Sequence, residues 1–156
     1  MTTVTKAYDA GEVAKYFIYL SSKKVIGDTG EREGISNLKL QKVLYLAQAY
    51  YLSKLNKPLF SDSIEAWKYG PVVPGVYHLY KSNKNTPIID TKDRSKLSPK
   101  DKNVLDRIWD SFGGYSAGKL VDITHADTPW KNAFSSQSRV ISNNAIRNYY
   151  KPLIGN

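Results

Sequence analysis

The fold is decided by one stretch of the chain, from Leu38 to Tyr80, which reads LKLQKVLYLAQAYYLSKLNKPLFSDSIEAWKYGPVVPGVYHLY. Apolar residues in its first part recur at intervals of three and four, which places them along one side of an α-helix. We expect this single apolar stripe to face the core. Its members are Leu40, Leu44, Ala47 and Tyr51.

Cap and breaker residues set the limits of this helix. Ser36 or Asn37 suits its N-cap, because the side-chain oxygen of either residue can accept a hydrogen bond from the first turn. We expect the helix to end near Asn56, since Pro58 cannot continue it.

The second part of the stretch is expected to hold a short strand and another helix. Residues 64–69 are too few to classify by their period, and we interpret them as a strand with Trp67 and Tyr69 on one face. Gly70-Pro71 is then expected to end the strand in a turn, and Pro74 suits the first turn of a helix.

The flanking sequence predicts five further short helices. Between the first two helices, residues 27–34 contain three glycines and no periodicity, so we expect a mobile surface loop. Residues 82–96 are also loop-like, with 87–89 as a candidate second strand. The sequence therefore predicts a mainly α fold: one compact domain, residues 1–156, of about seven short helices with room for a small two-stranded β element. The expected N-caps of the flanking helices are Asp9, Ser98, Ser116, Asp127 or Thr128, and Ser142 or Asn143.

Composition narrows the class of protein. A chain of 156 residues that is 41% hydrophobic suits one domain with a buried core. Its net charge of +9 favours an anionic partner, such as a nucleic acid, an acidic protein or a membrane surface, and equally serves solubility. Cysteine is absent, which excludes disulfides, thiolate nucleophiles and sulfur-ligated metals. There is no apolar signal core and no run of about 18 apolar residues, so we expect a cytoplasmic protein without membrane attachment.

Two patterns resemble catalytic motifs. Residues 113–119 match GxxxxGK, but Leu120 stands where a phosphate loop needs Ser or Thr, so we interpret them as the end of one helix and the start of the next. His125 precedes Asp127 by two positions, which leaves open a hydrolytic pair with Ser116, Ser135 or Ser136 as nucleophile, a structural hydrogen bond or a partner contact. No nucleophile-elbow sequence supports the hydrolytic pair. His78 lies far from His125 in sequence, and we expect no metal and no cofactor.

Three motifs occur in a fixed order along the chain. They are LxLQKxLYLAQ at residues 38–48, EAWxYGPV at 65–72 and THxxxPW at 124–130. With them the chain resembles the SocA-like antitoxin family, also called the Panacea domain and often described as phage-associated protein, over residues 10–152. The resemblance implies a non-enzymatic antitoxin that neutralises a cognate toxin by direct protein contact. In that family the THxxxPW segment recurs without an established enzymatic role, which favours a non-catalytic His125.

Candidate contact residues follow from the resemblance and from side-chain chemistry. Lys39 and Lys42 lie three positions apart on the expected helix, and such a basic edge suits an acidic or phosphate-bearing partner or simply water. Aromatic residues gather around the Gly-Pro turn, as they do at binding hot spots and in cores. The residues expected to contact the toxin are Lys39, Lys42, Trp67, Tyr69, Tyr77, His125 and Trp130.

Other classes of function stay open. A nucleic-acid-binding regulator would use the positive charge, although that charge is spread from Lys6 to Lys151 rather than clustered. A phage accessory protein acting on a host factor and a hydrolase built on His125 and Asp127 are further alternatives. A homo-oligomer is also left open.

Overall fold

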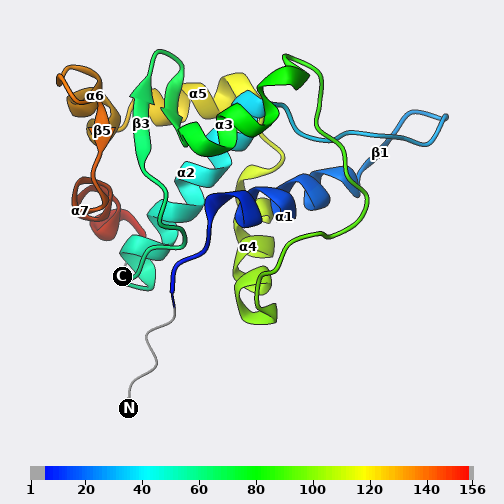
Figure 1. Cartoon of the computed structure of the whole chain (residues 1–156), viewed down its shortest axis with the longest axis horizontal. Coiled ribbons are helices and arrows are strands. Elements are labelled where there is room, and N and C mark those ends of the chain that lie inside the picture. Colours follow the sequence, from blue (N-terminus) through cyan, green and yellow to red (C-terminus); the bar gives the residue numbers. More distant parts are fainter. Residues whose placement is uncertain (1–5, 155–156) are drawn as a thin grey trace.

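The computed structural model describes residues 6–154. Within that range the chain forms seven α-helices, one 3₁₀ turn and five short strands, so the prediction of a mainly α fold with about seven helices is confirmed (Figure 1). The helices are α1 Ala10–Ser22, α2 Asn37–Lys54, α3 Pro74–Tyr80, α4 Pro99–Phe112, α5 Ala117–His125, α6 Thr128–Phe134 and α7 Asn143–Ile154, and the 3₁₀ turn is η1 Lys81–Asn83. The strands are β1 Val25–Ile26, β2 Glu31–Arg32, β3 Ile64–Trp67, β4 Gly70–Val72 and β5 Val140–Ile141.

Helix α2 is the central element of the fold, and helices α1, α3, α4, α5 and α7 all pack against it (Figure 1). The predicted stripe from Leu40 to Tyr51 is buried as expected. A single stripe describes α2 incompletely, however, because the helix is buried nearly all round and includes buried polar residues. These polar residues are Asn37, Gln41, Lys42, Gln48 and Ser53.

Side chains cap most of the helices at the predicted positions. Asp9, Ser36, Ser98, Ser116 and Ser142 each accept a hydrogen bond from a backbone N–H in the first turn of the following helix. These bonds satisfy donors that the helix itself leaves free. The interpretation of residues 113–119 as a helix end followed by a new helix is confirmed, since α4 ends there and Ser116 caps α5.

The main sheet has three antiparallel strands in the order β4-β3-β5. The strand predicted over residues 64–69 is confirmed over Ile64–Trp67. The candidate second strand at residues 87–89 is wrong, because Ile88 makes only an isolated bridge with Ile35. The partners of β3 come instead from Gly70–Val72 and Val140–Ile141. Gly70 and Pro71, which were expected to form a turn, therefore belong to the second strand of a hairpin.

A second, smaller hairpin replaces the loop expected at residues 27–34. Strands β1 and β2 pair across a turn in which Gly27 and Gly30 both adopt positive φ angles, 69° and 78°. Figure 1 shows this hairpin as an arm that extends from the end of α1. Its mobility stays a prediction. None of the helices within residues 6–154 combines the length and the apolar character needed to cross a membrane.

Candidate functional site

The candidate site is built on the β3–β4 hairpin. Trp67 pairs with Gly70, which leaves only Lys68 and Tyr69 in the turn. The Tyr69 side chain lies at this tip and is 58% exposed, although tyrosine carries enough apolar area to favour burial. Because Tyr69 occupies the turn, the expectation that it shares a strand face with Trp67 is wrong.

Gly70 lets the hairpin approach α2 closely. Its φ angle is 109°, a conformation that side chains rarely adopt. A Cβ at this position would lie 2.8 Å from Cε of Lys42 and 3.0 Å from Oγ1 of Thr124. The glycine of the EAWxYGPV motif therefore serves both the turn geometry and the passage of the Lys42 side chain.

The THxxxPW segment holds this turn from the other side. His125 Nε2 lies 2.9 Å from the carbonyl oxygen of Lys68, and Trp130 Nε1 donates to the carbonyl oxygen of Trp67 at 2.9 Å. The two rings stack on each other with centroids 4.2 Å apart. A carbonyl can only accept, so Nε2 carries the proton in this arrangement. His125 and Trp130 thus fix the backbone that presents Tyr69.

Asp127 does not pair with His125. Its carboxylate is buried and accepts hydrogen bonds from the hydroxyls of Tyr45, at 3.1 Å, and Tyr150. Burial raises the pKa of the Asp127 carboxyl, while the hydroxyl donors work in the opposite direction. Asp127 occupies the predicted N-cap position of α6, but its side chain makes no capping hydrogen bond there. The hydrolytic pair considered from the sequence is therefore not assembled.

The candidate serine nucleophiles are likewise engaged elsewhere. Ser116 caps α5, and the hydroxyls of Ser135 and Ser136, just after α6, donate to the backbone carbonyls of Lys131 and Ala133 within that helix. Among residues 6–154 no group of three or more carboxylate or imidazole side chains lies close enough to hold a metal ion.

Lys39 and Lys42 do not form a common basic edge. Lys39 Nζ donates to the carbonyl oxygen of Gly113 at 2.6 Å and lies over the ring of Trp109, so it stabilises the C-terminus of α4. Lys42 points toward the hairpin and is fully buried, with Nζ donating to the carbonyl oxygen of Pro71 at 3.0 Å. Lys42 therefore lies neither on a basic face shared with Lys39 nor on an edge of the helix that faces water.

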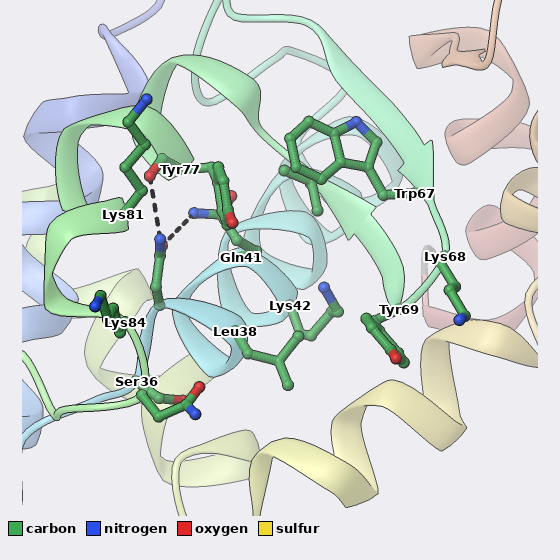
Figure 2. A pocket seen from close by; sticks show the side chains of 13 residues that line it. Ser36, Leu38, Gln41, Lys42, Trp67, Lys68, Tyr69, Tyr77, Lys81 and Lys84 are labelled. Atoms are coloured by element: carbon green, nitrogen blue, oxygen red, sulfur yellow. Dashed lines mark hydrogen bonds between the residues drawn. The ribbon is translucent and has the colours of Figure 1, made fainter.

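A pocket of about 430 Å³ opens between the N-terminus of α2, the hairpin and α3 (Figure 2). Tyr77 meets Trp67 edge to face at 5.0 Å on one side, and Tyr69 lies on another, near Lys42. The polar network of Asn37 and Gln41, which bonds the Tyr77 carbonyl and the Val73 N–H, joins α2 to the start of α3. The lining residues are Ser36, Asn37, Leu38, Gln41, Lys42, Trp67, Lys68, Tyr69, Val72, Tyr77, Lys81, Lys84 and Asn85.

The charged side chains that line this pocket are all positive. Four lysines line it, and its lining, all within the described residues, includes no Asp or Glu. Burial alone lowers the pKa of Lys42 to about 7, because no carboxylate compensates its charge. An ammonium has three donors, and the hydrogen bond to Pro71 uses one of them. The pocket can therefore stabilise an anion.

The structure brings together some of the candidate contact residues and separates others. Lys42, Trp67, Tyr69 and Tyr77 line the pocket, His125 and Trp130 hold its hairpin, and Lys39 lies apart at the end of α4. Reasoning from the sequence missed Leu38, Gln41, Lys68, Lys81 and Lys84. The available signal was the position of Gln41 and Lys42 between the apolar residues Leu40 and Val43, but that pattern predicts an exposed face equally well.

Comparison with known proteins identifies the family. A family model described as "Antitoxin SocA-like, Panacea domain" matches residues 40–131, which include the hairpin, most of the pocket lining and the His125–Trp130 segment. The chain is 35% identical over 109 residues to "Antitoxin SocA" of Caulobacter vibrioides (strain NA1000 / CB15N). That similarity covers 62% of this chain and 58% of the relative. No solved structure matches the chain. The chain belongs to the SocA-like antitoxin family, as the three motifs predict.

Proposed function

We propose that this protein is a non-enzymatic antitoxin that neutralises a cognate toxin in the cytoplasm by direct protein contact. Family membership supports the antitoxin role, and the relative's name gives the same class of function. The observation that carries the contact surface is the exposed tip residue Tyr69 on a turn held by His125 and Trp130. A tyrosine side chain has only two χ angles, so it loses little conformational entropy when a partner covers it.

The proposed surface consists of the hairpin tip and the rim of the pocket. Lys68 stands beside Tyr69, and Lys81 and Lys84 lie across the pocket opening on η1 and just after it (Figure 2). Such a surface suits a toxin face that carries carboxylates and apolar side chains. Inhibition would be steric, because the bound antitoxin covers the toxin's active site or its substrate-binding face.

The experiment that tests this function first expresses each open reading frame next to this gene on its own and selects one that stops cell growth as the toxin. Both genes are expressed in the same cells, and growth rescue is compared for the wild type, Tyr69→Ala and Tyr115→Ala. Tyr115 is a matched control, since it is also exposed and does not line the pocket. We expect Tyr69→Ala to weaken binding of the purified toxin at least tenfold and to reduce rescue, with Tyr115→Ala unchanged.

Two results would contradict the proposal. Rescue without a physical complex between the purified proteins would replace direct contact with an indirect effect. Salt-sensitive binding of DNA or RNA, with no toxin complex, would favour the nucleic-acid-binding regulator instead.

A further inference from the structure

The floor of the pocket is a buried amine without a counter-ion. Lys42 has no exposed surface, and its lowered pKa has burial as its only cause. A buried ammonium is costly unless an opposite charge accompanies it. Its neighbour Pro71 supplies one carbonyl oxygen, which leaves further N–H donors for a ligand.

The walls of the pocket are apolar and aromatic. Leu38 and Val72 contribute aliphatic side chains to the lining, and Trp67, Tyr69 and Tyr77 contribute aromatic ones. A volume of about 430 Å³ exceeds what one carboxylate fills and falls in the range of ligand pockets. The space therefore accommodates an acidic group together with a neighbouring apolar or aromatic side chain.

Charge decides between anions. Only one cationic group, Lys42, lies at the buried floor, while Lys81 and Lys84 are exposed. One buried positive charge balances a carboxylate, whereas a phosphate dianion would bring a second negative charge into an apolar environment. The lysines at the rim attract an acidic segment as it approaches.

We propose that this pocket receives a Glu or Asp side chain from an acidic segment of the partner protein, with Lys42 binding the carboxylate and the aromatic walls packing an adjacent aromatic residue. This inference rests on the proposed antitoxin function for the source of the segment. It assigns a specific chemistry to the contact: one buried ion pair, formed only in the complex, beside an aromatic anchor.

The test needs no toxin. The intact protein, labelled with ¹⁵N, is titrated with acetyl-Gly-Phe-Glu-Gly-amide, with its Phe-Gln analogue and with inorganic phosphate, and amide chemical shifts are followed by NMR. We expect the Glu peptide to shift resonances of the pocket residues and to bind at least tenfold more tightly than the Gln peptide. Phosphate should bind more weakly than the Glu peptide.

Variants separate the buried amine from general charge. Lys42→Met removes the ammonium and keeps an unbranched side chain, and we expect it to reduce binding of the Glu peptide to the level of the Gln peptide. Lys100→Met, at an exposed position on α4, removes the same charge elsewhere and should change binding less than twofold. If Lys42→Met does not fold, the exposed double variant Lys81→Met/Lys84→Met, expected to weaken binding about threefold or more, provides the second variant.

Several outcomes would overturn the inference. They are equal binding of the Glu and Gln peptides, shifts confined to residues outside the pocket, tighter binding of phosphate than of the Glu peptide, or no shift with the Glu peptide. Rescue of cells from the toxin by the wild type is measured separately, so the proposed function and the carboxylate site can fail independently. Rescue without peptide binding would contradict the carboxylate site and leave the antitoxin function standing. Peptide binding without rescue or a toxin complex would contradict the antitoxin function and leave a site for acidic peptides.

Discussion

Polar side chains of α2 hold backbone groups of other segments. Gln48 accepts from the N–H groups of Leu59 and Phe60 and donates to the Phe60 carbonyl. Gln41 accepts from the Val73 N–H, and Lys42 donates to the Pro71 carbonyl. These segments include irregular backbone whose polar groups would otherwise be buried without partners. The LxLQKxLYLAQ motif therefore combines an apolar core with polar anchors for the chain that follows it.

The burial of Lys42 predicts a dependence of stability on pH. The folded-state pKa of about 7 is below that of an exposed lysine, so above about pH 7 the unfolded chain binds more protons than the folded chain. Stability should therefore rise as the pH increases. We expect the titration of Lys42 to add about 2 kcal/mol to the free energy of unfolding between about pH 7 and about pH 9.

Urea denaturation of the wild type and Lys42→Met across this pH range measures the effect. The difference between the two unfolding free energies should change with pH in the stated direction. A constant difference would show that Lys42 titrates at its ordinary pKa.

Leu44 tests the position of α2 in the core. Its side chain is fully buried, so Leu44→Ala should lower the free energy of unfolding by about 2 to 5 kcal/mol. Leu79→Ala is the matched control, because this leucine is 64% exposed and its truncation should cost less than about 0.5 kcal/mol. A Leu44 effect as small as that of Leu79 would place this face of α2 at the surface.

At the level of elements, the β3–β4 hairpin depends on Gly70. Gly70→Ala should lower the free energy of unfolding by about 1 to 3 kcal/mol, because the positive φ strains an L residue and the added Cβ meets Lys42 and Thr124. Gly114→Ala is the control, since a Cβ there meets nothing within 4 Å and its φ is not positive. Chemical denaturation compares the two variants, and equal effects would contradict the close approach.

Local signals predicted the helices well and the sheet only in part. Caps such as Ser36 and Ser98 act within one turn, so the neighbouring sequence contains the information needed to place them. Strand β5 has only two residues, and its pairing with Ile64 spans most of the chain's second half. A strand that short has no period, and its existence depends on where α6 and α7 bring it.

The β1–β2 hairpin is expected to be the first site of proteolysis. Each strand has two residues, and Val25, Ile26 and the turn are exposed. Limited trypsin digestion should cleave near Arg32 before any other site within residues 6–154, since few contacts hold this backbone. Mass spectrometry of the early fragments identifies the cut. Persistence of this hairpin while α-helical segments are cleaved would show that it is well ordered.

For the whole molecule, three distant motifs converge on one turn. The helix motif supplies Lys42 beneath the hairpin, the second motif supplies the hairpin, and the third supplies His125 and Trp130. The aromatic components of this site were identifiable from sequence because their motifs are distinctive. The sequence did not reveal the burial of Lys42 or the tyrosine contacts of Asp127, because both depend on packing between segments far apart in sequence.

His125 therefore links the architecture of the turn to the proposed contact with a toxin. Its ring is half-buried, so His125→Ala should leave the protein folded, with thermal unfolding close to that of the wild type. The turn loses its bond at Lys68 and the stacking on Trp130, so Tyr69 should become less fixed. We expect weaker rescue from the toxin and no hydrolytic activity in either form.

His125→Gln, whose amide N–H can donate in place of Nε2, should restore part of the rescue. Unfolding of His125→Ala would make the histidine essential to the fold, unchanged rescue in a folded variant would remove it from the binding mechanism, and hydrolysis lost with His125 would establish an enzyme.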